Sequence, residues 1–237
     1  MVCVVRLRSF SCTSFVVVLS VGALAGCGGS SSNSIASKSA DEIVNESQRA
    51  ADSASSVHVS GSIIAGGSPI TLDLKLVAGK GASGELSENG LNFKLILIGK
   101  TAYISGSPAF YRHLGGTAAV QLLAGKWLKA SATTGEFASF SSLADMRKLI
   151  DSTLASHGVL KKGATTVVSS QKAIAVTDTS KGGTLYVATT GKPYPIEISK
   201  GGAESGKISF GGWNQLVAIA APANSVDLSE LQKAAGH

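Results

Sequence analysis

The spacing of apolar positions changes along the chain, and each change predicts a different element. Ser39 and Glu42 have the spacing of a capping box, and apolar residues follow at helical intervals, so residues 39–54 predict a helix. The period then becomes two, with apolar and polar residues alternating over 57–63 and 70–76. Such alternation is typical of antiparallel strands that bury one face.

Further alternating runs, separated by turn signals such as Asn89-Gly90, predict more strands on both sides of a central stretch. They lie at 82–87, 91–98, 101–105, 165–169, 173–178, 184–189, 196–199 and 207–210. In the central stretch, 118–123 predicts a short helix and 142–154 a longer one that Ser142 and Asp145 cap. Helices inserted between such strands predict an α+β fold, with a strongly curved antiparallel sheet wrapped over helices and room for a cavity between them.

The first residues have the order of an export signal. Arg6 and Arg8 supply positive charge, and the apolar stretch that ends at Leu24 is too short to span a bilayer, which takes roughly 20 apolar residues. It ends in Leu24-Ala25-Gly26-Cys27, which resembles the bacterial lipobox. Residues 1–26 therefore predict a lipoprotein signal peptide, with lipid attached to Cys27.

Cysteine usage agrees with this interpretation. Cys3 and Cys12 lie inside the predicted signal peptide, so the mature chain keeps Cys27 alone and cannot form an intramolecular disulfide. A lone thiol is unusual in an exported protein, and acylation explains it. The alternative is an ordinary secretory signal that Cys27 follows by chance.

The remaining chain divides into a tether and one domain. Residues 27–38 start with a Gly/Ser-rich run and predict a lipidated cysteine followed by a flexible tether, and 39–237 has the length of a single domain. We therefore expect an exported protein that is lipid-anchored to the outer face of the cell membrane or to another envelope membrane.

Composition narrows the partners. Apolar residues are 44% and charged ones only 15%, which fits a large interior or an apolar lining in addition to a core. The formal charge is +6, of which Arg6 and Arg8 supply two, so the mature chain carries +4, which suits an anionic membrane surface. No basic cluster with interleaved aromatics is present, so we expect no nucleic acid.

Motifs for chemistry are absent or misleading. Gly79 to Gly84 matches a dinucleotide-binding pattern, but the sequence after it predicts a turn and not the helix that would hold a pyrophosphate. The histidines have no partners at metal-ligand spacing, and no G-x-S-x-G motif occurs. We expect no metal, no cofactor and no catalytic residue. A hydrolase would need a Ser or Asp beside His58, His113 or His157.

Five short stretches carry a resemblance. They are the lipobox at 24–27, Val57-His58-Val59-Ser60-Gly61, Thr101-Ala102-Tyr103-Ile104, Gly125-Lys126-Trp127-Leu128 and Trp213-Asn214. In this order the chain resembles the LppX, LprA, LprF and LprG lipoproteins of mycobacteria and, more distantly, the LolA and LolB lipoprotein carriers. The resemblance implies a half-barrel of antiparallel sheet folded over helices, enclosing an apolar cavity that holds acyl chains of lipids or glycolipids. It implies no catalytic residue, and the lipidated cysteine corresponds to Cys27.

Strand parity predicts which residues line that cavity, and plain core packing is the alternative for each. They are Leu72, Leu74, Leu76, Leu95, Leu97, Ile174, Val176, Ile196 and Ile198 on strands, with Leu149 and Ile150 on the covering helix.

The predicted function is a membrane-anchored lipoprotein, not an enzyme, that binds a lipid or acylated glycolipid and carries or presents it in the envelope. An envelope transport protein is a further candidate partner. The alternatives are an accessory lipoprotein with a solid core that binds a protein or wall polymer, and an envelope hydrolase.

Overall fold

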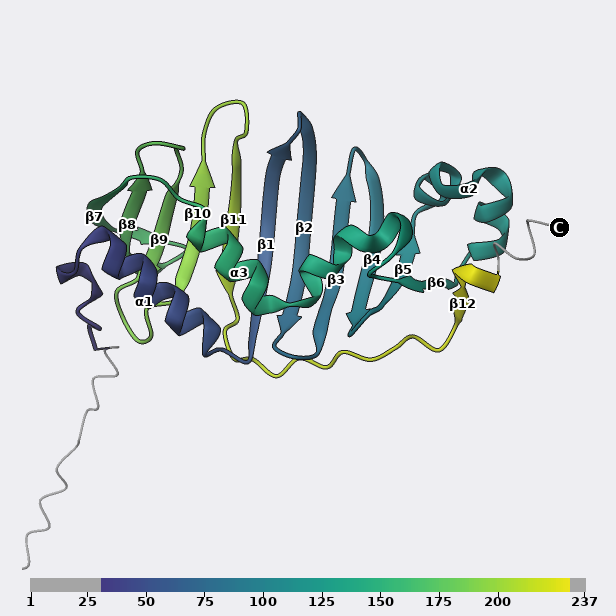
Figure 1. Ribbon diagram of the computed structural model, residues 1–237, viewed down its shortest axis with the longest axis horizontal. Helices are drawn as coiled ribbons and strands as arrows, with labels where there is room; N and C mark the ends of the chain where they lie inside the picture. The colour runs from purple at the N-terminus through teal and green to yellow at the C-terminus, as the bar shows by residue number, and fades with distance from the viewer. Residues whose placement is uncertain (1–30, 231–237) are drawn as a thin grey trace, which may run out of the picture.

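A computed structural model describes residues 31–230, so the predicted signal peptide and Cys27 lie outside the described residues. Figure 1 shows one long sheet with helices along it. The helical elements are η1 (Ile35–Ser37), α1 (Ala40–Asp52), α2 (Pro108–Leu123), η2 (Gly135–Ala144) and α3 (Met146–Ala155), where η denotes a 3-10 helix. The strands are β1 (Ser56–Ala65), β2 (Ser68–Val77), β3 (Gly81–Glu88), β4 (Leu91–Ile98), β5 (Thr101–Gly106), β6 (Trp127–Ser131), β7 (Leu160–Val168), β8 (Gln171–Asp178), β9 (Thr184–Ala188), β10 (Pro195–Lys200), β11 (Gly206–Gly211) and β12 (Ser225–Asp227).

The two groups of predicted strands form one sheet. Its order is β12-β6-β5-β4-β3-β2-β1-β11-β10-β9-β8-β7, and only the β12–β6 pair is parallel. The groups join where β1 pairs with β11, with Val59 opposite Phe210. Since β7 and β12 are the edges of this order, the described strands do not close into a barrel.

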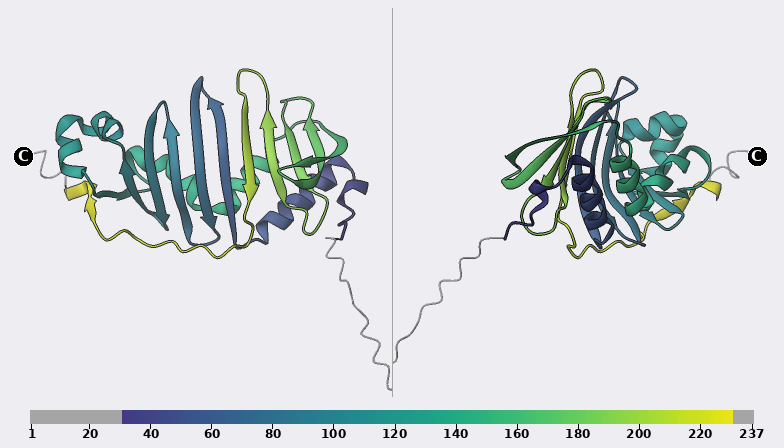
Figure 2. Two further views of the ribbon diagram at one scale, coloured as in Figure 1. Left: turned by 180° about the vertical axis from the view of Figure 1, so that it is seen from behind. Right: turned by 60° about the vertical axis from the view of Figure 1, so that its left-hand side comes forward.

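The helices lie on one face of the sheet (Figures 1 and 2). Helix α1 packs over β7 to β10, α3 lies beside α1, and η2 lies over β3, β4 and β6. The core forms between these helices and the inward-facing side chains of the strands, such as Val57, Leu76 and Leu97, each 1% exposed or less. None of the described helices is long and apolar enough to cross a bilayer.

The opening helix is confirmed together with its cap. The Ser39 hydroxyl accepts a hydrogen bond from the Glu42 amide, while the Glu42 carboxylate accepts one from the Ser39 amide. Both bonds satisfy amides that have no partner inside a helix. Ile43, Val44 and Ala51 of the predicted stripe are buried.

The central stretch differs from its prediction. Helix α3 begins at Met146 with Asp145 as its N-cap, not at Ser142, because η2 occupies 135–144. Helix α2 is longer than predicted and kinks at Gly115 and Gly116, whose backbones are not helical. The short strands β6 and β12 carry too few alternating residues to have been predicted.

Part of the predicted tether packs on the domain. Ser32 bridges Thr190, the Asn33 amide donates to the Thr189 carbonyl at 3.1 Å, and Ile35 is fully buried. The packed domain therefore already includes residues 32–38. A flexible tether stays a prediction for the residues before them.

The α+β class is confirmed, whereas the structure of residues 31–230 does not show that the cavity is enclosed. The apolar space on the helix-covered face consists of open hollows, described below.

Candidate functional site

The first hollow, here the α3 pocket, lies between α3 and the middle of the sheet. Its volume is about 570 Å³, in the range of small-molecule sites. Strands β1, β2, β10 and β11 form its floor, and α3 with the end of η2 forms its roof. Its lining residues are Val59, Ile63, Ile64, Gly66, Leu72, Leu74, Leu143, Leu149, Ile150, Thr153, Ile198, Lys200, Glu204, Gly206, Ile208 and Phe210.

Five of the eleven predicted lining residues come together in this pocket: Leu72, Leu74, Leu149, Ile150 and Ile198. Another five are buried in the main core, away from the α3 pocket. They are Leu76, Leu95, Leu97, Ile174 and Val176. Whether any of the eleven contacts a ligand stays a proposal.

Ile196 lies elsewhere because of a β-bulge. The pairing of β10 with β9 shifts between Pro195 and Glu197, so strict alternation fails there. Ile196 instead packs with Ala173 and Ala188 in a small cluster separate from the main core. A bulge of this kind leaves no signal in the alternation of apolar residues.

Sequence reasoning missed Val59, Ile63, Ile208 and Phe210, which complete the floor of the pocket. Ile208 and Phe210 alternate with polar residues in β11, as Val59 and Ile63 do in β1, so alternation could have placed them on a buried face. What it could not supply was the β1–β11 pairing that brings them together.

Charge is confined to the rim of the α3 pocket. Lys200 and Glu204 form an ion pair of 2.7 Å at the β10–β11 turn. The hydrogen bond from Lys200 lowers the pKa of the Glu204 carboxyl, so this carboxyl is ionised at neutral pH. The pocket thus offers an apolar interior with a polar, charged mouth.

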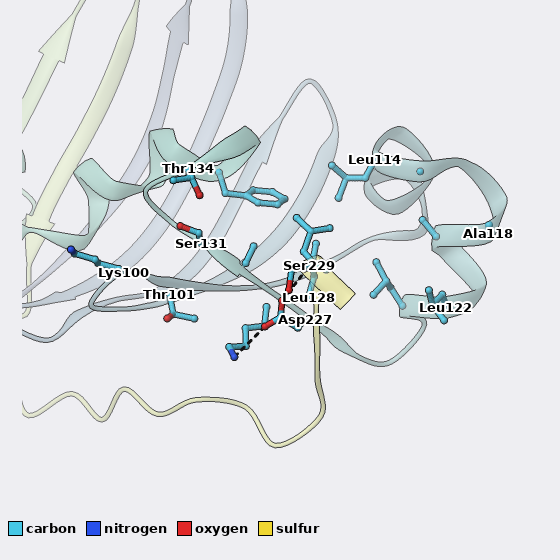
Figure 3. A pocket seen from close by; sticks show the side chains of 17 residues that line it. Lys100, Thr101, Leu114, Ala118, Leu122, Leu128, Ser131, Thr134, Asp227 and Ser229 are labelled. Carbon is cyan, nitrogen blue, oxygen red and sulfur yellow. Dashed lines mark hydrogen bonds and ion pairs between the residues drawn. The ribbon is translucent and has the colours of Figure 1, made fainter. Parts of the chain in front are cut away.

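The second hollow, here the α2 pocket, lies at the far end of the sheet between α2 and the strands β5, β6 and β12. Its volume is about 830 Å³. Figure 3 shows Leu114, Ala118 and Leu122 on the helix, facing Leu128 on β6. Polar groups are part of this lining, including the Lys129–Asp227 ion pair at 3.3 Å. The hydrogen bond from the Ser229 hydroxyl and the ion pair with Lys129 lower the pKa of Asp227.

An aromatic cluster on η2, β4 and α2 separates the two pockets. Phe93 on β4 lies 4.9 Å from Phe110 and 5.7 Å from Phe140 of η2, between ring centroids, and Phe140 lies 5.9 Å from Phe137. Because η2 lies over β3 and β4, between the floors of the two pockets, the α3 and α2 pockets have no lining residue in common.

A histidine–carboxylate pair does occur, on the other face of the sheet. His58 Nε2 lies 2.8 Å from Asp73 Oδ1, and both side chains are exposed, 38% and 62%. Among residues 31–230 no serine hydroxyl hydrogen-bonds to His58, and the His58–Asp73 pair lies outside both pockets. The same residues hold no group of three or more His, Cys, Asp or Glu that could bind a metal ion.

Comparisons with known proteins give matches at the level of structure alone. No family model matches the chain, and no curated protein matches it significantly. LprF from Mycobacterium bovis superposes with a TM-score of 0.56 at 13% identity, covering 78% of this chain and 97% of LprF. LppX, a lipoprotein of Mycobacterium tuberculosis, gives 0.47 at 17% identity, covering 76% and 98%. The MucA/MucB complex of Pseudomonas aeruginosa gives 0.38 at 16% identity, covering 81% and 60%. The resemblance deduced from the sequence is thereby confirmed for the fold, which this chain shares with LprF.

Proposed function

We propose that this chain is a membrane-anchored lipoprotein that binds the acyl part of a lipid or glycolipid in the α3 pocket and carries or presents it in the cell envelope. The observation that carries the proposal is an apolar hollow in the middle of the sheet whose charged residues, Lys200 and Glu204, lie at its rim. The fold shared with LprF supports it.

The arrangement suits an amphiphile for a physical reason. Each methylene removed from water contributes about 0.8 kcal/mol, so acyl chains favour a pocket lined by Leu, Ile and Phe side chains. A polar headgroup left at the mouth can bond to Lys200 or Glu204 without being desolvated. No covalent step is required of the protein.

Anchoring through Cys27 belongs to the same proposal. Fatty chains on Cys27 would hold the domain at a membrane, since stable anchoring requires more than one lipid chain or a second membrane contact. We expect the full chain to fractionate with membranes and a Cys27→Ser variant to appear in the soluble fraction. A Cys27→Ser chain that stays membrane-bound after salt and carbonate washes would contradict this anchor.

The ligand proposal is tested by mass spectrometry of lipids extracted from the purified full chain. The informative pair of variants is Leu149→Trp and Leu122→Trp, because each leucine lies on a helix that roofs one pocket. We expect lipid to be lost from Leu149→Trp and retained by Leu122→Trp. Circular dichroism checks that both variants are folded.

The other outcomes are equally informative. Lipid lost only from Leu122→Trp would move the site to the α2 pocket. No lipid in the unmodified chain, even after incubation with envelope lipids, would favour an accessory lipoprotein that engages a protein or wall polymer.

A further inference from the structure

A long uncharged segment runs along one edge of the sheet. After β11 the chain continues from Gly212 to Asn224 without helix or strand, passing beneath β1 to β6 before it enters β12 (Figures 1 and 2). We name residues 212–224 the strap. In sheet order it spans seven strand spacings, roughly 33 Å at about 4.8 Å each. Its residues reach roughly 43 Å when fully extended, so the strap has little slack and follows the edge closely.

The strap presents apolar side chains to solvent. No charged residue occurs between Lys207 and Asp227. Leu216 is fully exposed, whereas Val217 and Ile219 are half-buried, so alternate side chains point away from the domain. Within 216–223 no backbone hydrogen bond joins the strap to the rest of the described chain. The exposed apolar side chains are Leu216, Ala218, Ala220, Ala221 and Ala223, which follow one another along the constrained segment. Contiguous exposed apolar surface of this kind marks an interaction site.

The same edge carries lysines without acidic partners. Four exposed lysines lie in or beside the turns at this edge: Lys80, Lys100, Lys172 and Lys192. None of them forms an ion pair within residues 31–230, whereas Lys200 at the opposite edge pairs with Glu204. Near Lys80, the start of α3 adds Arg147 and an Asp145–Lys148 pair at 3.4 Å. With Asp52 at the end of α1 and Asp145 counted, lysine and arginine still outnumber acidic residues at the lower edge in Figure 1. The opposite edge mixes Glu88 and Glu204 with its lysines.

Aromatic side chains and the chain entry lie at this edge too. Tyr194 and Trp213 stack with ring centroids 4.5 Å apart, and the Lys192 ammonium lies 5.9 Å from the Tyr194 ring. Ser31, the first described residue, accepts a hydrogen bond from the Gly191 amide in the adjoining turn. The described part of the chain thus begins beside the turn that contains Lys192. Tyr194 and Trp213 are partly buried against the core. Tyr, Trp and Lys at an edge that also carries an exposed leucine are the composition of a membrane interface.

We propose that the strap edge, formed by Leu216 of the strap, the Tyr194–Trp213 stack and the four unpaired lysines, docks on an anionic phospholipid surface. Leu216 enters the interfacial region, and the lysines face lipid phosphates. This surface is separate from the α3 pocket and depends on the proposed function only for the envelope location. Binding through this surface would determine which edge of the sheet faces the membrane.

The experiment is vesicle flotation of residues 27–237 with Cys27→Ser, which lacks the lipid anchor. The described strands and the described core lie within 31–230, so we expect this chain to keep its fold. We expect binding to phosphatidylcholine vesicles that contain about 30% phosphatidylglycerol, and little binding to phosphatidylcholine alone. Raising the salt from about 0.15 M to about 1 M should release the protein, since the Debye length falls from about 8 Å to about 3 Å.

Matched variants assign the surface. Lys172→Gln with Lys192→Gln should weaken binding roughly 25-fold, because each lysine near an anionic surface contributes about fivefold. Lys161→Gln with Lys181→Gln removes the same charge from the opposite edge and should leave binding unchanged. Leu216→Ser should weaken binding about tenfold, since a buried leucine side chain contributes at least that much. Val159→Ser, at a 67% exposed valine of the opposite edge, is its control.

Three results would overturn the proposal: no binding to anionic vesicles, equal binding to neutral ones, or an equal loss in the two lysine pairs. In the first case the strap would be a surface for a protein partner. Flotation is independent of lipid extraction. A failure to bind vesicles would therefore not contradict lipid binding in the α3 pocket, and an empty pocket would not contradict membrane docking.

Discussion

The α3 and α2 pockets differ in the polarity of their lining, because they lie over different parts of the sheet. The α3 pocket lies over strands paired on both sides, so the backbone is satisfied by the ladder and the floor is almost entirely aliphatic. The α2 pocket lies where the sheet ends in the short strand β12, and its lining includes Thr101, Ser131 and the Lys129–Asp227 pair. The larger hollow is thus the more polar one, because backbone and charged groups at a sheet edge must be hydrogen-bonded or hydrated.

The roofs differ in the same way. Helix α3 is an unbroken helix with an N-cap, and it packs against α1. Helix α2 is kinked at Gly115 and Gly116 and covers only the end of the sheet. Volume alone would choose the α2 pocket as the binding site. The more apolar lining and the unbroken helix above it favour the α3 pocket as the binding site.

The largest effect on stability is expected below the aromatic cluster that lies between the two pockets. Leu95 is fully buried on β4, two residues from Phe93 of this cluster. Leu95→Ala should lower the free energy of unfolding by about 3 to 4 kcal/mol, because it leaves a cavity. Urea denaturation measures it. A loss of unfolding free energy below about 1 kcal/mol would indicate that the core beneath the aromatic cluster is loosely packed and that the two pockets form one continuous cavity.

A smaller effect, confined to the α2 pocket, is expected at the kink. Gly116 has φ 67° and ψ −158°, a backbone region open essentially to glycine alone. Gly116→Ala should therefore cost about 1 to 3 kcal/mol in urea denaturation and alter the roof of the α2 pocket, while lipid extracted from the α3 pocket stays the same. Reduced lipid content in this variant would show that the two pockets are coupled.

The cap of α3 tests the other roof. The Lys148 amide donates to Asp145 Oδ1 at 3.2 Å, and this bond lowers the pKa of the Asp145 carboxyl. Asp145→Ala should cost about 1 kcal/mol at neutral pH. Because the folded-state pKa is lowered, the contribution is present above the ordinary aspartate pKa of about 3.9 and is lost as the pH falls through the lowered value. Wild type and variant should converge in acid, and a constant difference would assign the effect to packing.

The smallest effect concerns the contact between α1 and α3. Burial, followed by the charge of the neighbouring Asp151, raises the pKa of the Asp52 carboxyl. A raised pKa means that the folded state binds this proton more tightly, so stability declines as the pH rises through the raised value. Asp52→Asn should remove that decline and gain less than about 1 kcal/mol at neutral pH, measured by urea denaturation across the pH range. Asp41→Asn is the control on an exposed part of α1, and the same gain there would exclude the Asp151 contact as the cause.

Local features of this protein could be deduced from the sequence because they depend on residues close together in the chain. The Ser39–Glu42 cap, the alternation in β1 and β2 and the turn at Asn89-Gly90 each rest on neighbours within a few positions. Period and cap chemistry act at that range, and they were sufficient to predict the α+β class. The predicted lipidation of Cys27 is of the same local kind.

Tertiary structure alone decided which distant segments meet. The β1–β11 pairing joined the two groups of strands into one sheet and created the floor of the α3 pocket. The aromatic cluster lies between the two pockets, and a bulge places Ile196 outside the α3 pocket. The chain between β11 and β12 follows the edge of the sheet that carries the unpaired lysines. Alternation states that a strand has a buried face but not which strand or helix buries it, because many partners offer similar apolar area and the choice is made by the packing of the whole domain.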